Sequence, residues 1–389
     1  MIYFDNAATS GKKPIEVIKA VNNAIINYSA NPGRSGHTLS QRVAEKVYLV
    51  REKIAAFFGA SGPENVILTS NCTHSSNLVI KGVLNKPDHI IISSLEHNSV
   101  IRPIVKLGIE YDIAKVDFEN DDQTVKNFEK LIKANTKLIF CTAASNVTGK
   151  ILPISQIGEL CKRRGILFGV DAAQLAGIRS IDMKKLNIDF LCVAPHKGLY
   201  APMGTGILIA EKYIENTLIE GGTGSNSGSL IQPSESPERY ESGTVNVAGI
   251  FGIGAGIDFV KNKGIEQIYH HEMELIKYAY RGLMKIKNIC LYTPYPIEPF
   301  YAPVLSFNFK GVHSEIAALN LSKNGIAVRG GLHCSPLAHK ELGTLDFGAV
   351  RLSVSYFNSM REIEYFLEVI KSQKFIKNLK INVDTKDLI

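Results

Sequence analysis

Residues 166–177 read ILFGVDAAQLAG, and residues 190–206 read FLCVAPHKGLYAPMGTG. Each segment begins with apolar residues that do not alternate with polar ones, which is typical of a strand buried on both faces of a parallel sheet. Asp171 ends the first strand, and Lys197 follows the second. Because the carboxyl ends of parallel strands meet at one crevice, we expect Asp171 and Lys197 to face the same crevice.

Similar short apolar runs alternate with helical patterns around this stretch. The predicted strands cover residues 66–69, 90–94, 111–116, 137–142, 166–170, 190–193 and 207–210. The clearest helix covers residues 40–58, with an apolar stripe and Gly59 just past its end, and another covers 155–164. Repeated strand–helix units predict an α/β domain with a mostly parallel sheet.

The pattern changes after about Asp258. We predict a helix over 265–286, strands over 304–309, 326–329 and 350–354, and a further helix from about Met360. This order favours a second, smaller α+β domain. We therefore divide the chain into a large domain of residues 16–258 and a small domain of residues 1–15 and 259–389. Residues 374–389 have little apolar periodicity, and we expect them to form a surface appendage.

The composition restricts the possible functions. The 389 residues include 44 Lys and Arg and 37 Asp and Glu, so the formal net charge is +7. The basic residues are dispersed along the sequence. This argues against nucleic-acid or membrane binding. No apolar run approaches the roughly 18 residues of a membrane span, and the start, MIYFDNAATS, does not resemble a signal peptide. Six scattered cysteines favour a reducing compartment, so we expect a cytoplasmic protein.

Lys197 and Asp171 together suggest a specific chemistry. A buried lysine can form a Schiff base with an aldehyde cofactor, while a fixed carboxylate keeps a pyridine nitrogen protonated so that the ring accepts electrons. Taken alone, a His-Lys pair is usually a surface feature and an aspartate at a strand end usually belongs to a turn. The flanking motifs decide between these interpretations.

Further motifs extend along the whole chain. They are DNAAT at 5–9, NPGRSGHTLS at 31–40, EHNS at 96–99, SNVTG at 145–149, GGTGS at 221–225, ESGTVN at 241–246 and RGGLHC at 329–334. In this order and spacing they resemble the class V aminotransferase superfamily, and within it the cysteine desulfurases of the short-loop, selenocysteine lyase-like group. The resemblance implies a homodimeric, pyridoxal 5'-phosphate-dependent transferase of fold type I, with a seven-stranded, mostly parallel sheet in its large domain.

The resemblance also implies roles for residues around the cofactor. Lys197 resembles the lysine that holds pyridoxal phosphate, Asp171 the partner of the pyridine nitrogen, and Gln174 the donor to the phenolic oxygen. His97 matches the histidine that stacks on the ring, where an imidazole can also move protons. Its alternative is a histidine at a helix start near a phosphate or a backbone group.

Phosphate contacts are expected at a helix start, where backbone N–H groups and the helix dipole favour an anion. The segment LTSNCTHSSNLVIKG supplies such a start. The resemblance implies phosphate contacts from Thr73 within it, from His196 and, from the neighbouring subunit, from Thr244. Two residues depart from the family pattern. His74 stands where relatives often have Glu, and Ala194 stands where they often have a Ser or Thr that reaches the phosphate.

Substrate binding and sulfur chemistry are expected from the second domain. Arg351 matches the arginine that binds the α-carboxylate of an amino acid, and a planar guanidinium suits that task. Asn146 resembles the asparagine that helps to orient substrate and ring. Cys334 lies in a glycine-containing loop with Arg329 and His333, and neighbouring cations favour a thiolate. Cys334 resembles the cysteine that takes the substrate's sulfur as a persulfide, whereas we expect the other five cysteines to be small buried apolar side chains.

The expected reaction converts L-cysteine to L-alanine. Arg351 binds the substrate, Lys197 moves a proton from its α-carbon, and Cys334 attacks its sulfur. The persulfide then passes to an acceptor, such as an iron–sulfur scaffold or a sulfur carrier protein. Selenocysteine lyase, cysteine sulfinate desulfinase and another class V aminotransferase remain alternatives with the same cofactor.

A dinucleotide-binding or regulatory module is the alternative that is not an enzyme. Its signal is weak, because GIGAG at 252–256 is not a GxGxxG that follows a strand. We expect no metal site, because His270 and His271 have no other His or Cys at metal-ligand spacing.

Overall fold

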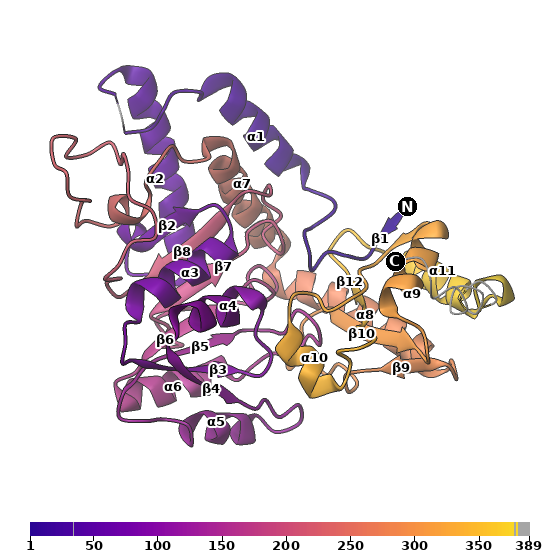
Figure 1. Ribbon diagram of the computed structural model, residues 1–389. Coiled ribbons are helices and arrows are strands. Elements are labelled where there is room, and N and C mark those ends of the chain that lie inside the picture. Colours follow the sequence, from indigo (N-terminus) through magenta and orange to yellow (C-terminus); the bar gives the residue numbers. More distant parts are fainter. Residues whose placement is uncertain (34, 377–378, 380–389) are drawn as a thin grey trace.

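A seven-stranded sheet forms the centre of the larger part of the molecule (Figure 1). The computed structural model describes residues 1–33, 35–376 and 379. The strands are β2 (Val66–Thr69), β3 (His89–Ser93), β4 (Glu110–Ala114), β5 (Thr136–Thr142), β6 (Leu167–Asp171), β7 (Phe190–Val193) and β8 (Gly206–Ala210), in the order β2-β8-β7-β6-β5-β3-β4. Strand β8 runs antiparallel to both neighbours and the other pairs are parallel. The predicted α/β fold is confirmed, and each predicted strand overlaps an observed one.

Helices cover both faces of this sheet. They are α1 (Ile15–Asn27), α2 (Thr38–Phe58), α3 (Cys72–Val83), α4 (Asn98–Leu107), α5 (Asp121–Glu129), α6 (Ile154–Arg164) and α7 (Val247–Lys263), with short 3-10 turns at η1 (Pro63–Asn65) and η2 (Glu238–Tyr240). Alternate residues of a strand point to opposite faces. Ile139 accordingly packs in one hydrophobic cluster with residues of α2, α6 and α7, whereas Leu138 and Phe140 pack in another with residues of α3 and α4. The sheet is therefore buried on both sides, as its unbroken apolar runs predict.

The glycines of the GIGAG segment lie inside α7. A Cβ on Gly256 would lie 1.9 Å from the carbonyl oxygen of Leu199, and one on Gly252 would lie 2.5 Å from Pro202 Cδ. These glycines therefore let α7 approach the loop that carries Lys197. They belong to a helix interior and do not form the phosphate-binding turn of a dinucleotide site.

A second hydrophobic core lies in the other half of the molecule, whose elements are on the right in Figure 1. Its elements are β1 (Ile2–Tyr3), α8 (Ile265–Met284), β9 (Ile289–Leu291), β10 (Val304–Phe309), α9 (Ser314–Lys323), β11 (Ile326–Ala327), α10 (Pro336–Leu342), β12 (Val350–Ser353) and α11 (Met360–Lys371). Strand β10 lies between β12 and β9, antiparallel to both, and β1 pairs in parallel with β11. The first strand of the chain and its last described helix therefore lie in the same half of the molecule.

The structure bears on two boundaries expected from the sequence, one after residue 258 and one at residue 374. The division after residue 258 falls inside α7, whereas Phe4 packs on Phe366 of the second core, with ring centroids 6.2 Å apart. The division into domains itself stays a prediction. The expected surface appendage is wrong at its start, because Phe375 is buried against Phe309. Residues 377–378 and 380–389 lie outside the described residues.

Among the described residues, each helix is too short or too polar to cross a membrane.

Candidate active site

Asp171 and Lys197 line one cavity of about 220 Å³. Asp171 ends β6, and Lys197 follows the neighbouring strand β7, so the sheet brings the two residues together. The Asp171 side chain is held in place, because Oδ1 accepts hydrogen bonds from Ala173 N at 2.9 Å and from Cys72 Sγ at 3.5 Å. Burial lowers the pKa of Lys197, although the nearby Asp171 carboxylate opposes that shift. A buried amine with a lowered pKa is a better nucleophile than an exposed one.

Eight of the ten predicted site residues line this cavity. They are Thr73, His97, Asn146, Asp171, Gln174, His196, Lys197 and Arg351. Thr244 and Cys334 are not among its lining residues. The structure thus assembles most of the predicted set at the carboxyl ends of the central strands.

His97 combines a structural contact with a place in the cavity wall. It caps the start of α4, where its Nδ1 accepts from Ser99 N at 3.1 Å, so the ring proton of the neutral form lies on Nε2. Burial lowers the pKa of His97. The alternative of a helix-start histidine is therefore observed, and stacking on a cofactor ring stays a prediction.

Gln174 joins the cavity to the first residues of the chain. Its Nε2 donates to the carbonyl oxygen of Ala7 at 3.0 Å. The DNAAT segment thereby forms part of the cavity wall, and Ala7 and Ala8 both line it.

The start of α3, where an anion site is predicted, lies at the wall of this cavity. Asn71 caps this helix by accepting from His74 N at 2.9 Å, and Thr73 lines the cavity in the first turn. His196 faces the same cavity, and burial lowers its pKa to about 4. Its buried Nδ1 has no hydrogen-bond partner among the described residues. Ala194 also lines the cavity but contributes no hydroxyl.

Thr244 lies in a separate cavity of about 280 Å³, together with His74. Its Oγ1 accepts from Asn31 Nδ2 at 3.3 Å. Within one chain Thr244 is therefore not part of the Lys197 cavity, and a contribution across subunits stays a prediction.

Arg351 has a counter-ion that the sequence analysis did not identify. Its Nη2 lies 2.6 Å from Asp5 Oδ1, and its Nη1 donates to the main-chain oxygen of Asn146 at 3.1 Å. The side chain is 1% exposed, and its Nε is buried without a partner among the described residues. Burial lowers the pKa of Arg351, and Asp5 opposes this shift. The only sequence signal for Asp5 is its place in the DNAAT motif.

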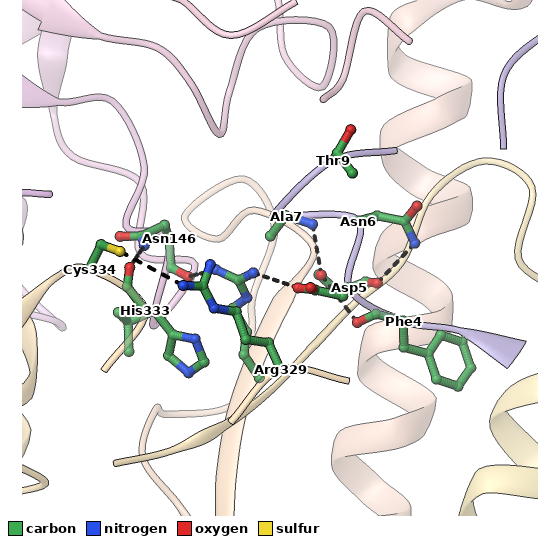
Figure 2. A network of polar contacts seen from close by, with 12 residues as sticks. Phe4, Asp5, Asn6, Ala7, Thr9, Asn146, Arg329, His333 and Cys334 are labelled. Carbon is green, nitrogen blue, oxygen red and sulfur yellow. Dashed lines mark hydrogen bonds and ion pairs between the residues drawn. The ribbon is translucent and has the colours of Figure 1, made fainter. Parts of the chain in front are cut away.

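Cys334 is exposed and lies at the edge of the polar contacts that link Asp5, Arg351 and Asn146 (Figure 2). Its Sγ lies 3.7 Å from Arg329 Nη2, and Arg329 lines the Lys197 cavity. His333 and Cys334 have φ angles of +51° and +58°. This left-handed conformation costs a residue with a side chain about 1–2 kcal/mol, so the loop must be held by its surroundings.

Arg329 and His333 differ in their effect on the Cys334 thiol. Arg329 meets the expectation of a neighbouring cation, because its guanidinium contacts the sulfur. His333 does not, because it is 2% exposed and its Nε2 donates to the Ala349 carbonyl oxygen at 2.9 Å. Burial and the nearby Arg351 lower the pKa of His333 to about 2, so the ring is neutral. His333 therefore adds no positive charge beside the thiol, and the sequence does not reveal that this ring is buried.

The other cysteines differ in their surroundings. Cys141, Cys161 and Cys192 are buried, as expected, and Cys290 is partly buried. The expectation of a small apolar side chain is wrong for Cys72, which lines the Lys197 cavity and donates to Asp171. Its place beside Thr73 at the helix start is the signal that could have identified it.

The residues of the cavity fit pyridoxal phosphate. Lys197 supplies a buried amine for an aldehyde, Asp171 a fixed carboxylate for a pyridine nitrogen, and α3 an N-terminus for a phosphate. The unpartnered Nδ1 of His196 adds a polar atom that a bound group would satisfy. Among the residues that the structure describes, no cluster of His, Cys, Asp or Glu could hold a metal ion.

Known proteins resemble this chain over nearly its whole length. The proteins named "Probable cysteine desulfurase" in Pyrococcus abyssi and Borreliella burgdorferi are 35% and 34% identical to it, covering 98% and 97% of this chain and 95% and 92% of their own lengths. The apo structure of a cysteine desulfurase from Thermococcus onnurineus superimposes with a TM-score of 0.87 at 34% identity, covering 97% of this chain and 95% of that one. The family model described as Aminotransferase class-V matches residues 2–366. The chain therefore belongs to the class V aminotransferase family.

Proposed function

We propose that this protein is a pyridoxal phosphate-dependent cysteine desulfurase, which converts L-cysteine to L-alanine and transfers the sulfur to Cys334. The observation that carries the proposal is the position of Arg329. Its guanidinium lines the Lys197 cavity and also contacts the sulfur of Cys334 at 3.7 Å, so an exposed thiol lies beside the cofactor site. The relatives named cysteine desulfurase support the same activity.

Three residues would hold the cofactor and the substrate. Lys197 would anchor pyridoxal phosphate, and Asp171 would pair with its ring nitrogen. When bound, this cofactor supplies a ring that accepts electrons from the substrate's α-carbon. Arg351 would bind the substrate's carboxylate through the guanidinium donors that Asp5 and Asn146 leave free, including the buried Nε. The Lys197 amine, once released, would take the proton from the α-carbon, because burial lowers its pKa.

Cys334 would perform the sulfur transfer. Its thiolate sulfur attacks the substrate's sulfur, a sulfur–sulfur bond forms, and the bond between the substrate's sulfur and its β-carbon breaks. The electron pair of that bond stays with the carbon skeleton, which takes up protons and leaves as alanine. Cys334 retains the sulfur as a persulfide, and the Arg329 guanidinium stabilises negative charge on this sulfur.

The test replaces Cys334 by Ser or Ala and measures alanine and sulfide formed from L-cysteine. We expect both products to fall to background, while the visible absorbance of the bound cofactor stays unchanged because Cys334 does not line its cavity. Unchanged turnover would refute Cys334 as the nucleophile. The same variants assayed with selenocysteine and cysteine sulfinate address the alternative substrates, because selenide and sulfite leave more readily and need no thiol.

We further propose that the enzyme is a homodimer in which Thr244 reaches the partner's cofactor site. Large apolar side chains support this assembly, because they are exposed on α2 and on the long loop between β8 and α7. They are Leu39, Tyr48 and Leu49 on α2 and Ile219, Leu230 and Ile231 on the loop. The two elements are neighbours, since Tyr48 lines the same cavity as loop residues 223–225 (Figure 1).

Subunit mixing tests the shared site. We expect Lys197→Ala and Thr244→Ala to be weakly active alone, whereas their mixture regains activity because one hybrid site has both residues. Light scattering gives the mass of the assembly, and a monomer of full activity would contradict the proposal. A cytoplasmic location and transfer of the persulfide to an acceptor protein complete the proposed function. The six free cysteines are compatible with a reducing compartment.

A further inference from the structure

The amide of Asn146 bonds to the residues on both sides of Cys334. Its Nδ2 donates to the carbonyl oxygen of His333 at 2.8 Å, and its Oδ1 accepts from Ser335 Oγ at 2.6 Å. A carbonyl oxygen can only accept, so the first bond fixes which side of the amide carries the nitrogen. We call these two bonds the Asn146 clamp. Figure 2 shows Asn146 beside His333 and Cys334.

The clamp holds a loop that needs support. His333 and Cys334 have φ angles of +51° and +58°, which are unfavourable for residues with side chains. A third contact acts on the same loop, because Asn98 N donates to the main-chain oxygen of Cys334 at 2.7 Å. The nucleophile is exposed, but these three hydrogen bonds hold residues 333–335 around it.

Hydrogen bonds also hold the turn that contains Asn146. This residue lies in the turn that follows β5, a strand of the large sheet, and in this turn Ser145 Oγ accepts from Val147 N at 3.2 Å and from Thr148 N at 3.1 Å. Its main-chain oxygen also accepts from Arg351 Nη1 at 3.1 Å. One residue therefore contacts both the arginine proposed to bind substrate and the loop that carries the nucleophile.

We propose that Asn146 is a positioning residue that fixes Cys334 Sγ relative to the sulfur of a substrate held by Arg351. The inference rests on the proposed function and deepens it. Attack of one sulfur on another requires an aligned approach, and small displacements of reacting groups lower the rate strongly. The clamp supplies this alignment by tying the loop to the turn after β5.

Ser335→Ala tests the clamp directly, because Ser335 is buried and does not line the Lys197 cavity. We expect kcat for alanine formation to fall about tenfold, with KM for L-cysteine and the absorbance of the bound cofactor unchanged. Asn146→Asp retains the acceptor for Ser335 but lacks the donor to His333, so it should show a loss of similar or larger size. Thr124→Val is the matched control, since it removes a buried hydroxyl on α5 that accepts from Asp117 N at 2.9 Å, a bond that involves none of residues 332–335.

Amide hydrogen exchange provides a readout that needs no turnover. In the full-length protein without cofactor, Ser335→Ala should accelerate exchange at residues 332–335 but not at residues 171–174, and Thr124→Val should not accelerate exchange at 332–335. A kcat within about twofold of the parent's, or unchanged exchange at 332–335, would overturn the proposal. Failure of the proposed function is distinguishable, because it appears as retained activity in Cys334→Ser, whereas the exchange experiment tests the clamp in either case.

Discussion

Asp5 and Arg351 form an ion pair of 2.6 Å between Oδ1 and Nη2, at the wall of the cavity that contains Lys197. The pair joins the first strand region of the chain to β12, and it shares the guanidinium that is proposed to bind the substrate's carboxylate. Arg351 is therefore already paired with the Asp5 carboxylate of the protein when no substrate is bound.

Asp5→Asn should strengthen substrate binding and weaken the fold. Without the Asp5 charge, the full charge of Arg351 faces the substrate, so we expect KM for L-cysteine to fall about threefold, as about 0.7 kcal/mol would give. The free energy of unfolding should fall by about 2 kcal/mol, because a hydrogen bond between charged groups is weakened. Steady-state kinetics and urea denaturation measure the two effects. A rise in KM would show that Asp5 mainly orients the guanidinium.

Arg329→Gln should make Cys334 less reactive. The guanidinium is 3.7 Å from the sulfur and would stabilise negative charge on it during reaction, so its loss should slow alkylation of Cys334 by iodoacetamide at pH 7 several-fold. His333→Gln is the control, because His333 is neutral and bonds to Ala349, and this variant should react at about the parent's rate. Slower alkylation in both variants would contradict the assignment of the charge to Arg329 alone.

Ala194→Thr should tighten cofactor binding. Ala194 lines the cavity beside His196 with a methyl group, where the family pattern often has a hydroxyl. One added hydrogen bond to phosphate contributes about 1 kcal/mol, so the dissociation constant of pyridoxal phosphate should fall about fivefold. Titration followed by absorbance gives this constant. Ala194→Val adds similar bulk without a hydroxyl, and equal tightening in that variant would count against a hydrogen bond.

Glu272→Gln should change how stability depends on pH. Glu272 is 1% exposed, and burial raises its pKa to about 8. Between the usual pKa of a glutamic acid and about 8, the folded state keeps this proton and the unfolded state releases it, so stability falls as pH rises through this window. The slope is at most about 1.4 kcal/mol per pH unit.

Urea denaturation at pH 5 and pH 8 measures the effect. The parent should lose more stability than Glu272→Gln over this interval, because the amide has no proton to release. Glu274→Gln, at an exposed position of the same helix, should follow the parent. Equal losses in the parent and in Glu272→Gln would show that Glu272 is already ionised in the folded protein.

Local sequence patterns predict the strands and helices whose apolar residues follow a short-range pattern. The unbroken apolar runs around Asp171 and Lys197 indicate the central strands, because a strand covered on both faces tolerates such a run. The apolar stripe before Gly59 predicts α2 to within two residues of its start. The meeting of Asp171 and Lys197 follows from strand direction alone.

Local sequence patterns do not predict contacts between segments that are distant in the sequence. Asp5 and Arg351 are 346 positions apart, and no local pattern indicates their pairing. The burial of His333 depends on the strand region that supplies Ala349, so its charge state cannot be inferred from its neighbours in sequence. The contact of Asn146 with Ser335 spans 189 positions and was likewise missed, although the resemblance marked Asn146 as important.

The distance along the chain between Asp5 and Arg351 has a consequence during protein synthesis. A ribosome delivers the seven strands of the large sheet well before it delivers β12. A nascent chain at that stage has Asp171 and Lys197 but lacks one wall of the cavity that both residues line. Catalytic competence therefore arrives late in translation, when nearly the whole polypeptide has emerged.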